Sequence, residues 1–192
     1  PAEPTYWGWY DLGRPPIADL LWFKAFNDRV LAPWNAAGVL SSDRFYNIRL
    51  HNRDEAALWK VWAALNTTLA HLVVEIWGRV SLGEGALDNM RYEAAAMPIV
   101  APEAIPPTLT APLRDSLLAL AARPIRSVFQ EAGAQEPQGV TLSGVLPDRR
   151  ALDRLVMGDV LGLTDEEQLA VYRAVLDLAR TRLQKAESVK RR

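Results

Sequence analysis

The sequence predicts an α+β protein: a small antiparallel sheet with packed helices, followed by a proline-rich connector and a helical C-terminal part. Short aromatic runs precede residue 50, and apolar residues then recur at helical spacing. Five prolines between residues 98 and 112 separate this region from the rest. All seven tryptophans lie at or before Trp77, so the two halves of the chain are built differently.

Several stretches before residue 50 have strand character. Leu20–Phe26 and Val30–Trp34 are short apolar and aromatic runs, and each predicts a strand. Asn35-Ala36-Ala37-Gly38 predicts a turn, because glycine accepts a positive φ. Residues 39–50 predict a third strand region, with Tyr46, Ile48 and Leu50 on one face and Phe45, Asn47 and Arg49 on the other. Residues 1–16 predict an irregular or edge segment.

A long helical pattern follows. Asp54 is a suitable N-cap, and the apolar residues after it recur every three or four positions up to Ile76. The triplet Asn66-Thr67-Thr68 favours helices poorly and predicts a break, with a new helix capped there. Gly78 predicts the helix end. Tryptophans 59, 62 and 77 lie on this helix and are expected in the core.

The prolines at 98–112 predict an extended connector, because proline removes a helical hydrogen bond. We therefore divide the chain into an α+β domain at 1–98, a connector at 99–112 and a helical subdomain at 113–192. In the subdomain the sequence predicts helices over 113–132, over Asp148–Leu161 with Asp148 as N-cap, and from a Thr164–Glu167 capping box to about Val189. The last helix carries an apolar stripe: Leu169, Tyr172, Leu176, Ala179 and Leu183.

Composition excludes several classes of protein. The net charge of −1 argues against binding nucleic acid by bulk charge alone, although a module that reads bases stays possible. No cysteine is present, which excludes disulfides and thiolate chemistry and fits a cytoplasmic protein. The chain begins at Pro1 without methionine, so we expect it to be a fragment of a longer protein.

The glycine-containing stretch at residues 77–88, WGRVSLGEGALD, does not match a phosphate-binding loop. A Walker A loop needs Lys and then Ser or Thr after its last glycine, whereas Ala86 follows Gly85 here. Gly83 and Gly85 lack the third glycine and the preceding strand of a dinucleotide-binding loop. The two histidines, His51 and His71, do not form a metal-ligand cluster, and His71 is expected to be a core or flank residue. No catalytic constellation or metal site is predicted.

A set of short motifs in a particular order resembles the C-terminal part of prokaryotic adenine-N6 DNA methyltransferases of restriction-modification and phage-defence systems. These motifs are RFYNI (44–48), ALNTT (64–68), GR (78–79) followed by LGEGAL (82–87), and YE (92–93) followed by MPI (97–99). The tail adds RPIRSVF (123–129), DRRALD (148–153) and GLT (162–164). The family usually has Asn at the position of Arg44.

The resemblance implies a target-recognition module that reads double-stranded DNA, so that a linked catalytic domain can flip out and methylate one adenine. This chain lacks the family's Asn/Asp-Pro-Pro-Tyr/Phe motif and its loop for S-adenosylmethionine. We therefore expect no activity and no cofactor in this chain. S-adenosylmethionine is expected in a covalently linked methyltransferase domain.

Base edges are read by Arg, Asn, Gln or Lys held on rigid elements. The candidate DNA-binding residues are Arg14, Lys24, Asn27, Arg29, Arg44, Asn47, Arg49 and Arg79. The alternative for each is a solvated surface residue. Arg79 has a structural alternative as well, because it could pair with Glu84 and close the turn. Trp7, Trp9, Trp22 and Trp34 could stack on a base, although core filling is the simpler interpretation.

A second function stays open from the sequence. In it the chain is a protein-interaction or scaffold domain that does not bind DNA, and its C-terminal helices dock a partner through the Tyr172 stripe.

Overall fold

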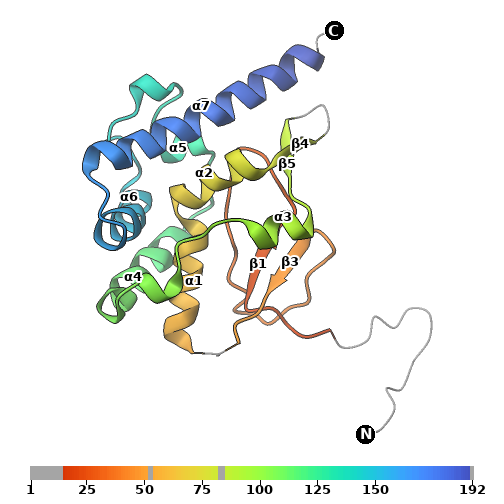
Figure 1. Cartoon of the computed structure of the whole chain (residues 1–192), viewed down its shortest axis with the longest axis vertical. Helices are drawn as coiled ribbons and strands as arrows, with labels where there is room; N and C mark the ends of the chain where they lie inside the picture. The colour runs from red at the N-terminus through yellow and green to blue at the C-terminus, as the bar shows by residue number, and fades with distance from the viewer. Residues whose placement is uncertain (1–14, 52–53, 82–84, 191–192) are drawn as a thin grey trace, which may run out of the picture.

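The computed structural model describes residues 15–51, 54–81 and 85–190. It confirms the α+β fold class, with two small antiparallel sheets, packed helices and a long C-terminal helix (Figure 1). The strands are β1 (Leu20–Phe23), β2 (Ala25–Phe26), β3 (Phe45–Ile48), β4 (Arg79–Ser81) and β5 (Ala86–Asp88). The helices are α1 (Glu55–Asn66), α2 (Thr68–Trp77), α3 (Arg91–Ala96), α4 (Thr110–Ala121), α5 (Val128–Glu131), α6 (Pro147–Asp153) and α7 (Asp165–Lys190). Shorter elements are the 3-10 turns η1 (Pro102–Ala104), η2 (Pro107–Leu109) and η3 (Pro137–Gly139), and the π-helical segment η4 (Arg154–Val160).

The predicted strand over 20–26 is confirmed, but it is shared between two sheets. β1 pairs antiparallel with β3, which places Trp22 opposite Tyr46. β2 joins the second sheet, whose strand order is β2-β5-β4. The change of sheet occurs at Lys24. Its N–H donates to Arg44 O (3.0 Å) and its carbonyl accepts from Asn89 N (2.9 Å), so this residue connects the two sheets.

The predicted strand over Val30–Trp34 is wrong. Only an isolated bridge between Leu20 and Trp34 occurs there. The Ala32 N–H donates to Asn66 Oδ1 (3.0 Å), and the Ala32 carbonyl accepts from Asn66 Nδ2 (3.1 Å) and Trp62 Nε1 (2.7 Å). Because side chains of α1 satisfy this backbone, the segment needs no strand partner. The following turn is confirmed, with Gly38 at φ 62°.

The predicted helix break is confirmed. Asp54 caps α1 by accepting from Ala56 N (3.2 Å). After α1 ends at Asn66, the Thr67 hydroxyl accepts from Ala70 N (3.1 Å) and caps α2. Gly78 ends α2, as predicted. The break redirects the chain, and the N–H groups of Thr68 and Ala70 at the start of α2 still find acceptors in Asp153 and Thr67.

The glycine-containing stretch is part of a β-hairpin that the sequence did not predict. β4 and β5 pair antiparallel, with Val80 opposite Leu87. Gly85 has φ 71°, which is a left-handed conformation, whereas Gly83 and Glu84 lie outside the described residues. Helix α3 follows β5 directly and was not predicted either.

The connector is not extended as predicted. Pro102 and Pro107 begin the 3-10 turns η1 and η2, where the missing proline N–H costs nothing. Pro112 lies in the first turn of α4. Ile105, between the two turns, is fully buried in the first hydrophobic core.

Two helix boundaries in the C-terminal half also differ from prediction. The predicted helix over 113–132 is interrupted because Pro124 cannot continue it; α4 ends at Ala121, and α5 begins after a capping box at Ser127. Asp148 is not an N-cap. Pro147 is the first residue of α6, and the Asp148 carboxylate instead accepts from Arg123 Nη2 (3.0 Å). The Thr164–Glu167 capping box is confirmed.

The hydrophobic core has two parts. The first contains apolar residues of β1, α1, β5, α4 and α6, including Leu20, Leu87 and Leu152. The second lies under α7, which runs along one side of the molecule and packs on α2 and α5 (Figure 1). Trp22, Trp59 and Trp62 are buried. The core position predicted for Trp77 is wrong, because it is 44% exposed. Among the described residues no helix is long and apolar enough to cross a membrane.

Candidate functional site: a groove between β3 and α3

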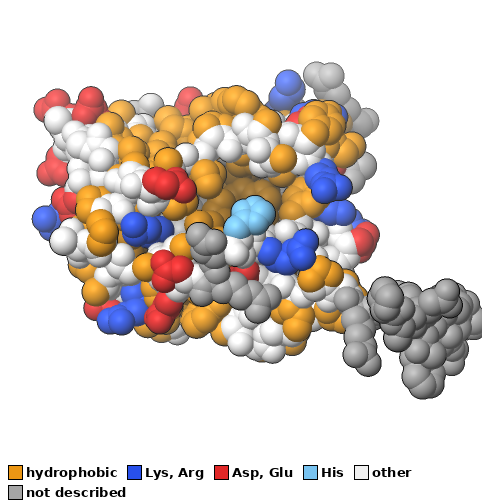
Figure 2. All heavy atoms as spheres, turned by 60° about the horizontal axis from the view of Figure 1, so that its bottom comes forward, with side chains coloured by type: hydrophobic (Ala, Val, Ile, Leu, Met, Phe, Trp, Pro, Cys, Tyr) orange, Lys and Arg blue, Asp and Glu red, His pale blue; other side chains and the backbone are white. Residues whose placement is uncertain are grey.

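One groove of about 540 Å³ lies between β3 and α3. We call it the β3–α3 groove and define it by its lining: Trp22, Lys24, Phe45, Tyr46, Asn47, Ile48, Arg49, Leu65, Arg91, Ala94, Ala95, Met97 and Ile99. Most of these side chains are apolar or aromatic. Figure 2 shows a hollow with hydrophobic walls on this side of the molecule, with Lys and Arg side chains near it.

The lysine of the groove is positioned by the sheet junction. The Lys24 backbone is hydrogen-bonded to Arg44 and Asn89, which adjoin β3 and β5, and these bonds fix where its side chain begins. Its Nζ lies 5.3 Å from the centroid of the Tyr46 ring, at cation–π distance. The Tyr46 hydroxyl donates to Asn89 O (2.8 Å), just before α3. Tyr46 therefore ties β3 to the start of the helix that forms the opposite wall.

Arg79 pairs with the carboxylate that caps α3. Glu93 of α3 reaches back to accept from Met90 N (2.7 Å), which caps the short helix. Arg79 Nε lies 2.9 Å from Glu93 Oε1, so β4 holds this capping carboxylate. The partner considered from the sequence, Glu84, lies outside the described residues. In the structure, then, Arg79 is engaged in an ion pair that stabilises α3.

The groove is electropositive in its lining. Lys24, Arg49 and Arg91 line it, and no Asp or Glu of the described residues does. None of these three cations forms an ion pair with another described residue.

Burial, followed by the charges of Asp88 and Glu93, raises the pKa of Tyr46 above its ordinary value of 10.0. Its hydroxyl thus stays protonated and a donor at neutral pH.

The eight candidate residues have different surroundings. Lys24, Asn47 and Arg49 each contribute to the lining of the β3–α3 groove. Arg29 Nε lies 3.8 Å from Asp28 Oδ1, and Arg79 pairs with Glu93, so each of these two arginines already has an acidic neighbour. The remaining three are not brought into the groove: Asn27 and Arg44 are exposed elsewhere, and Arg14 lies outside the described residues, as do Trp7 and Trp9.

Sequence reasoning missed Arg91 and the structural part played by Tyr46 and Asn89. Arg91 opens α3, a helix too short to show periodicity, so no signal in the sequence marked it. Asn89 is 1% exposed, and neither of its amide atoms has a hydrogen-bond partner in the described part of the chain. An unpaired buried amide costs about 1–3 kcal/mol, which makes it unusual in a folded core.

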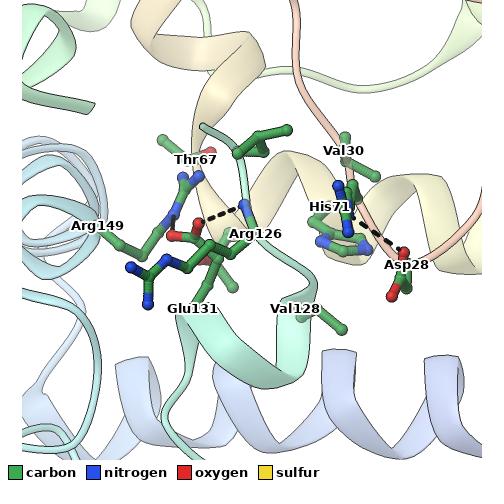
Figure 3. A pocket seen from close by; sticks show the side chains of 11 residues that line it. Asp28, Val30, Thr67, His71, Arg126, Val128, Glu131 and Arg149 are labelled. Carbon is green, nitrogen blue, oxygen red and sulfur yellow. Dashed lines mark hydrogen bonds and ion pairs between the residues drawn. The ribbon is translucent and has the colours of Figure 1, made fainter. Parts of the chain in front are cut away.

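A second, polar cavity lies beside His71 (Figure 3). Its volume of about 20 Å³ is enough for one water molecule and no larger ligand. Its carboxylate Glu131 is already engaged, because it accepts from Arg149 Nε (3.3 Å) and from the backbone N–H of Arg126 (3.2 Å). His71 is buried as expected, but its Nε2, 3.5 Å from Glu75 Oε1, has no hydrogen bond within the described residues. This small cavity is therefore a gap in the packed interior and not a ligand site.

Adenosine-binding sites use a glycine loop after a strand and a carboxylate for the ribose hydroxyls, and the lining of the β3–α3 groove contains neither. The described residues also contain no cluster of three or more metal-ligating side chains. What the groove provides is an apolar surface with cations beside it.

Comparison of the chain with protein-family models, with curated proteins and with solved structures found no match.

Proposed function

We propose that this chain is a DNA target-recognition module of an adenine-N6 DNA methyltransferase or restriction-modification enzyme, and that it binds DNA through the β3–α3 groove. The observation that carries the proposal is the convergence of Lys24, Asn47 and Arg49 with Arg91 on one groove. Cations that lack a carboxylate partner are the groups that neutralise DNA phosphates. The link to methyltransferases rests on the resemblance of the ordered motifs alone.

Two further features support a reading role rather than a catalytic one. Asn47 lies on a strand, and its Oδ1 is fixed by the Ser41 hydroxyl (2.6 Å), which leaves its amide N–H groups for a ligand. An asparagine held in this way can donate to a base acceptor such as adenine N7. The catalytic steps and S-adenosylmethionine would belong to a linked domain.

The alternative, a partner docked on the Tyr172 stripe, has less support. Tyr172, Leu176 and Ala179 are at most 1% exposed, and the Tyr172 hydroxyl donates to Asp153 Oδ2 (2.7 Å). The stripe is covered by this chain's own residues, so a partner would have to displace them. Burial of this stripe favours the groove as the functional surface.

The proposal is tested by fluorescence anisotropy of the chain with a pool of random-sequence duplexes at several salt concentrations. The logarithm of the binding constant should fall linearly with the logarithm of salt concentration. The double variant Arg49→Gln/Arg91→Gln should bind more weakly, and the slope should decrease by about 0.9 for each phosphate that the variant no longer neutralises.

Arg154→Gln is the matched control. Arg154 is exposed on η4, does not line the β3–α3 groove and has the same charge, so its removal should leave both affinity and slope nearly unchanged. Binding with no salt dependence, or equal weakening in Arg154→Gln and in the groove variant, would overturn the proposal for this chain.

A further inference from the structure

The cations of the β3–α3 groove suit the phosphates of any DNA, but its apolar interior does not suit the base edges of an intact duplex. A duplex presents phosphates and polar base edges, which need hydrogen-bonding partners. The interior of the groove is instead mostly apolar. Tyr46 and Ile48 line it on the β3 side, and Ala94 and Met97 line it on the α3 side. Nine of its thirteen lining residues are apolar or aromatic, a lining typical of a site for a flat apolar group.

We infer that the β3–α3 groove binds nucleotide bases that have left the duplex stack, with the phosphates of that strand held by Lys24, Arg49 and Arg91. The inference rests on the proposed function and names the form of DNA that the groove accepts. An unpaired base has two apolar faces and is joined to an anionic backbone. The groove has the complementary arrangement, an apolar interior with three cations and no carboxylate in its lining.

The volume agrees with this occupant. A groove of about 540 Å³ is in the range of sites that enclose small organic molecules, so it admits one or a few bases and excludes a whole duplex. Lys24 Nζ lies over the Tyr46 ring in the unbound chain. Because this lysine is held by its backbone and not by a carboxylate, its side chain can turn to a phosphate and uncover the ring for stacking.

The test compares three fluorescent probes bound by the full chain: a perfect duplex, the same duplex with a central three-nucleotide thymine bulge, and single-stranded oligo(dT). We expect the bulged duplex and oligo(dT) to bind at least about ten times more tightly than the perfect duplex. Tyr46→Leu should weaken binding of these two probes by about 5- to 100-fold, the range measured for removal of one base-stacking side chain. Its effect on the perfect duplex should be small.

Two variants separate an effect on stacking from an effect on folding. Tyr46→Phe keeps the ring and removes only the hydrogen bond to Asn89, so it should retain the preference for unpaired bases. Tyr92→Leu removes an aromatic ring that is 69% exposed on the same helix α3 but outside the groove, and it should bind like the unaltered chain. If Tyr46→Leu is unfolded by circular dichroism, Met97→Glu, which places a negative charge in the groove, replaces it.

The outcomes distinguish this inference from the proposed function. Equal affinity for the perfect and the bulged duplex, with salt dependence and no effect of Tyr46→Leu or Met97→Glu, overturns the inference and leaves DNA recognition standing. Absence of binding to every DNA probe overturns both. Binding of a glutamate-rich peptide containing Leu and Phe in place of DNA, abolished by Tyr46→Leu, also overturns both and assigns the groove to a protein partner.

Discussion

At the scale of single residues, Gly85 explains why the stretch after α2 needs its glycine. Its φ of 71° belongs to the left-handed region. A Cβ placed there would lie 2.9 Å from the Cβ of Ala186 on α7. The Gly85 carbonyl also accepts a hydrogen bond from Arg182 Nη1. Both contacts are structural, so the glycine fits α7 rather than a phosphate.

We therefore predict that Gly85→Ala destabilises the chain by about 1–3 kcal/mol, from backbone strain plus the contact with α7. Gly162→Ala is the control, because Gly162 has the same φ of 71° and nothing within 4 Å of its added Cβ. Thermal unfolding should show a larger fall in Tm for Gly85→Ala, partly reversed by adding Ala186→Gly. Equal falls would show that α7 does not constrain the loop.

At the scale of elements, Arg182 joins α7 to three other segments. Its guanidinium donates to Glu75 on α2 (2.7 and 3.0 Å), to the Gly85 carbonyl, and to the Asn27 carbonyl (2.8 Å). The side chains of Arg182 and Glu75 are 5% and 1% exposed. Two buried charges of this kind are costly to separate, because the remaining one stays in the interior without a partner.

Arg182→Met should therefore cost about 3–5 kcal/mol, measured by urea unfolding. The double variant Arg182→Met/Glu75→Leu should recover much of this stability, because an apolar pair replaces the ion pair without leaving a buried charge. If the double variant were as unstable as the single one, the ion pair itself, and not the unpaired carboxylate, would dominate the stability of this contact.

At the scale of the whole molecule, the two halves share a core and a network of buried charges. The first core cluster contains residues on both sides of the connector, from Leu20 to Val156. Burial alone would raise the pKa of Glu75 and Glu131, but the nearby His71 and the hydrogen bonds from Arg182 outweigh it at Glu75, and the hydrogen bonds from Arg123 outweigh it at Glu131. Both pKa values thus lie below the ordinary 4.5. The pKa of Asp148 is lowered below 3.8, since Arg123 outweighs its burial as well.

A carboxylate whose pKa is lowered by folding stabilises the protein above its unfolded pKa, and this contribution disappears as the pH falls through the folded value. The free energy of unfolding should therefore be nearly constant above about pH 5 and fall steeply below about pH 4. Glu131→Gln should lower stability at neutral pH and flatten the acid dependence. Glu103→Gln, at an exposed carboxylate, should change neither. Urea unfolding over a series of buffers from about pH 3 to about pH 7 measures both effects.

The features that the sequence predicted correctly depend on local interactions. The caps at Asp54, Thr67 and Thr164 and the helix end at Gly78 depend on hydrogen bonds within a few residues, so their spacing alone predicts them. The longer helices are also visible in the sequence, because helix geometry brings apolar residues to one face every three or four positions. The errors arose where a distant group changed the outcome. Asn66 satisfies the backbone of Ala32, which removes the need for a strand there.

The sequence by itself determined the α+β class, the helix break and the candidate residues of the N-terminal half. Only the tertiary structure decided which of those candidates come together. Lys24, Asn47 and Arg49 meet Arg91 because the chain changes sheets at Lys24 and because Tyr46 and Asn89 hold α3 opposite β3. The Tyr46–Asn89 hydrogen bond joins residues 43 positions apart, and no local pattern encodes such a distance. The ion pair between Arg79 and Glu93 likewise depends on the tertiary structure, because Glu93 lies on α3, a helix too short to show an apolar period in the sequence.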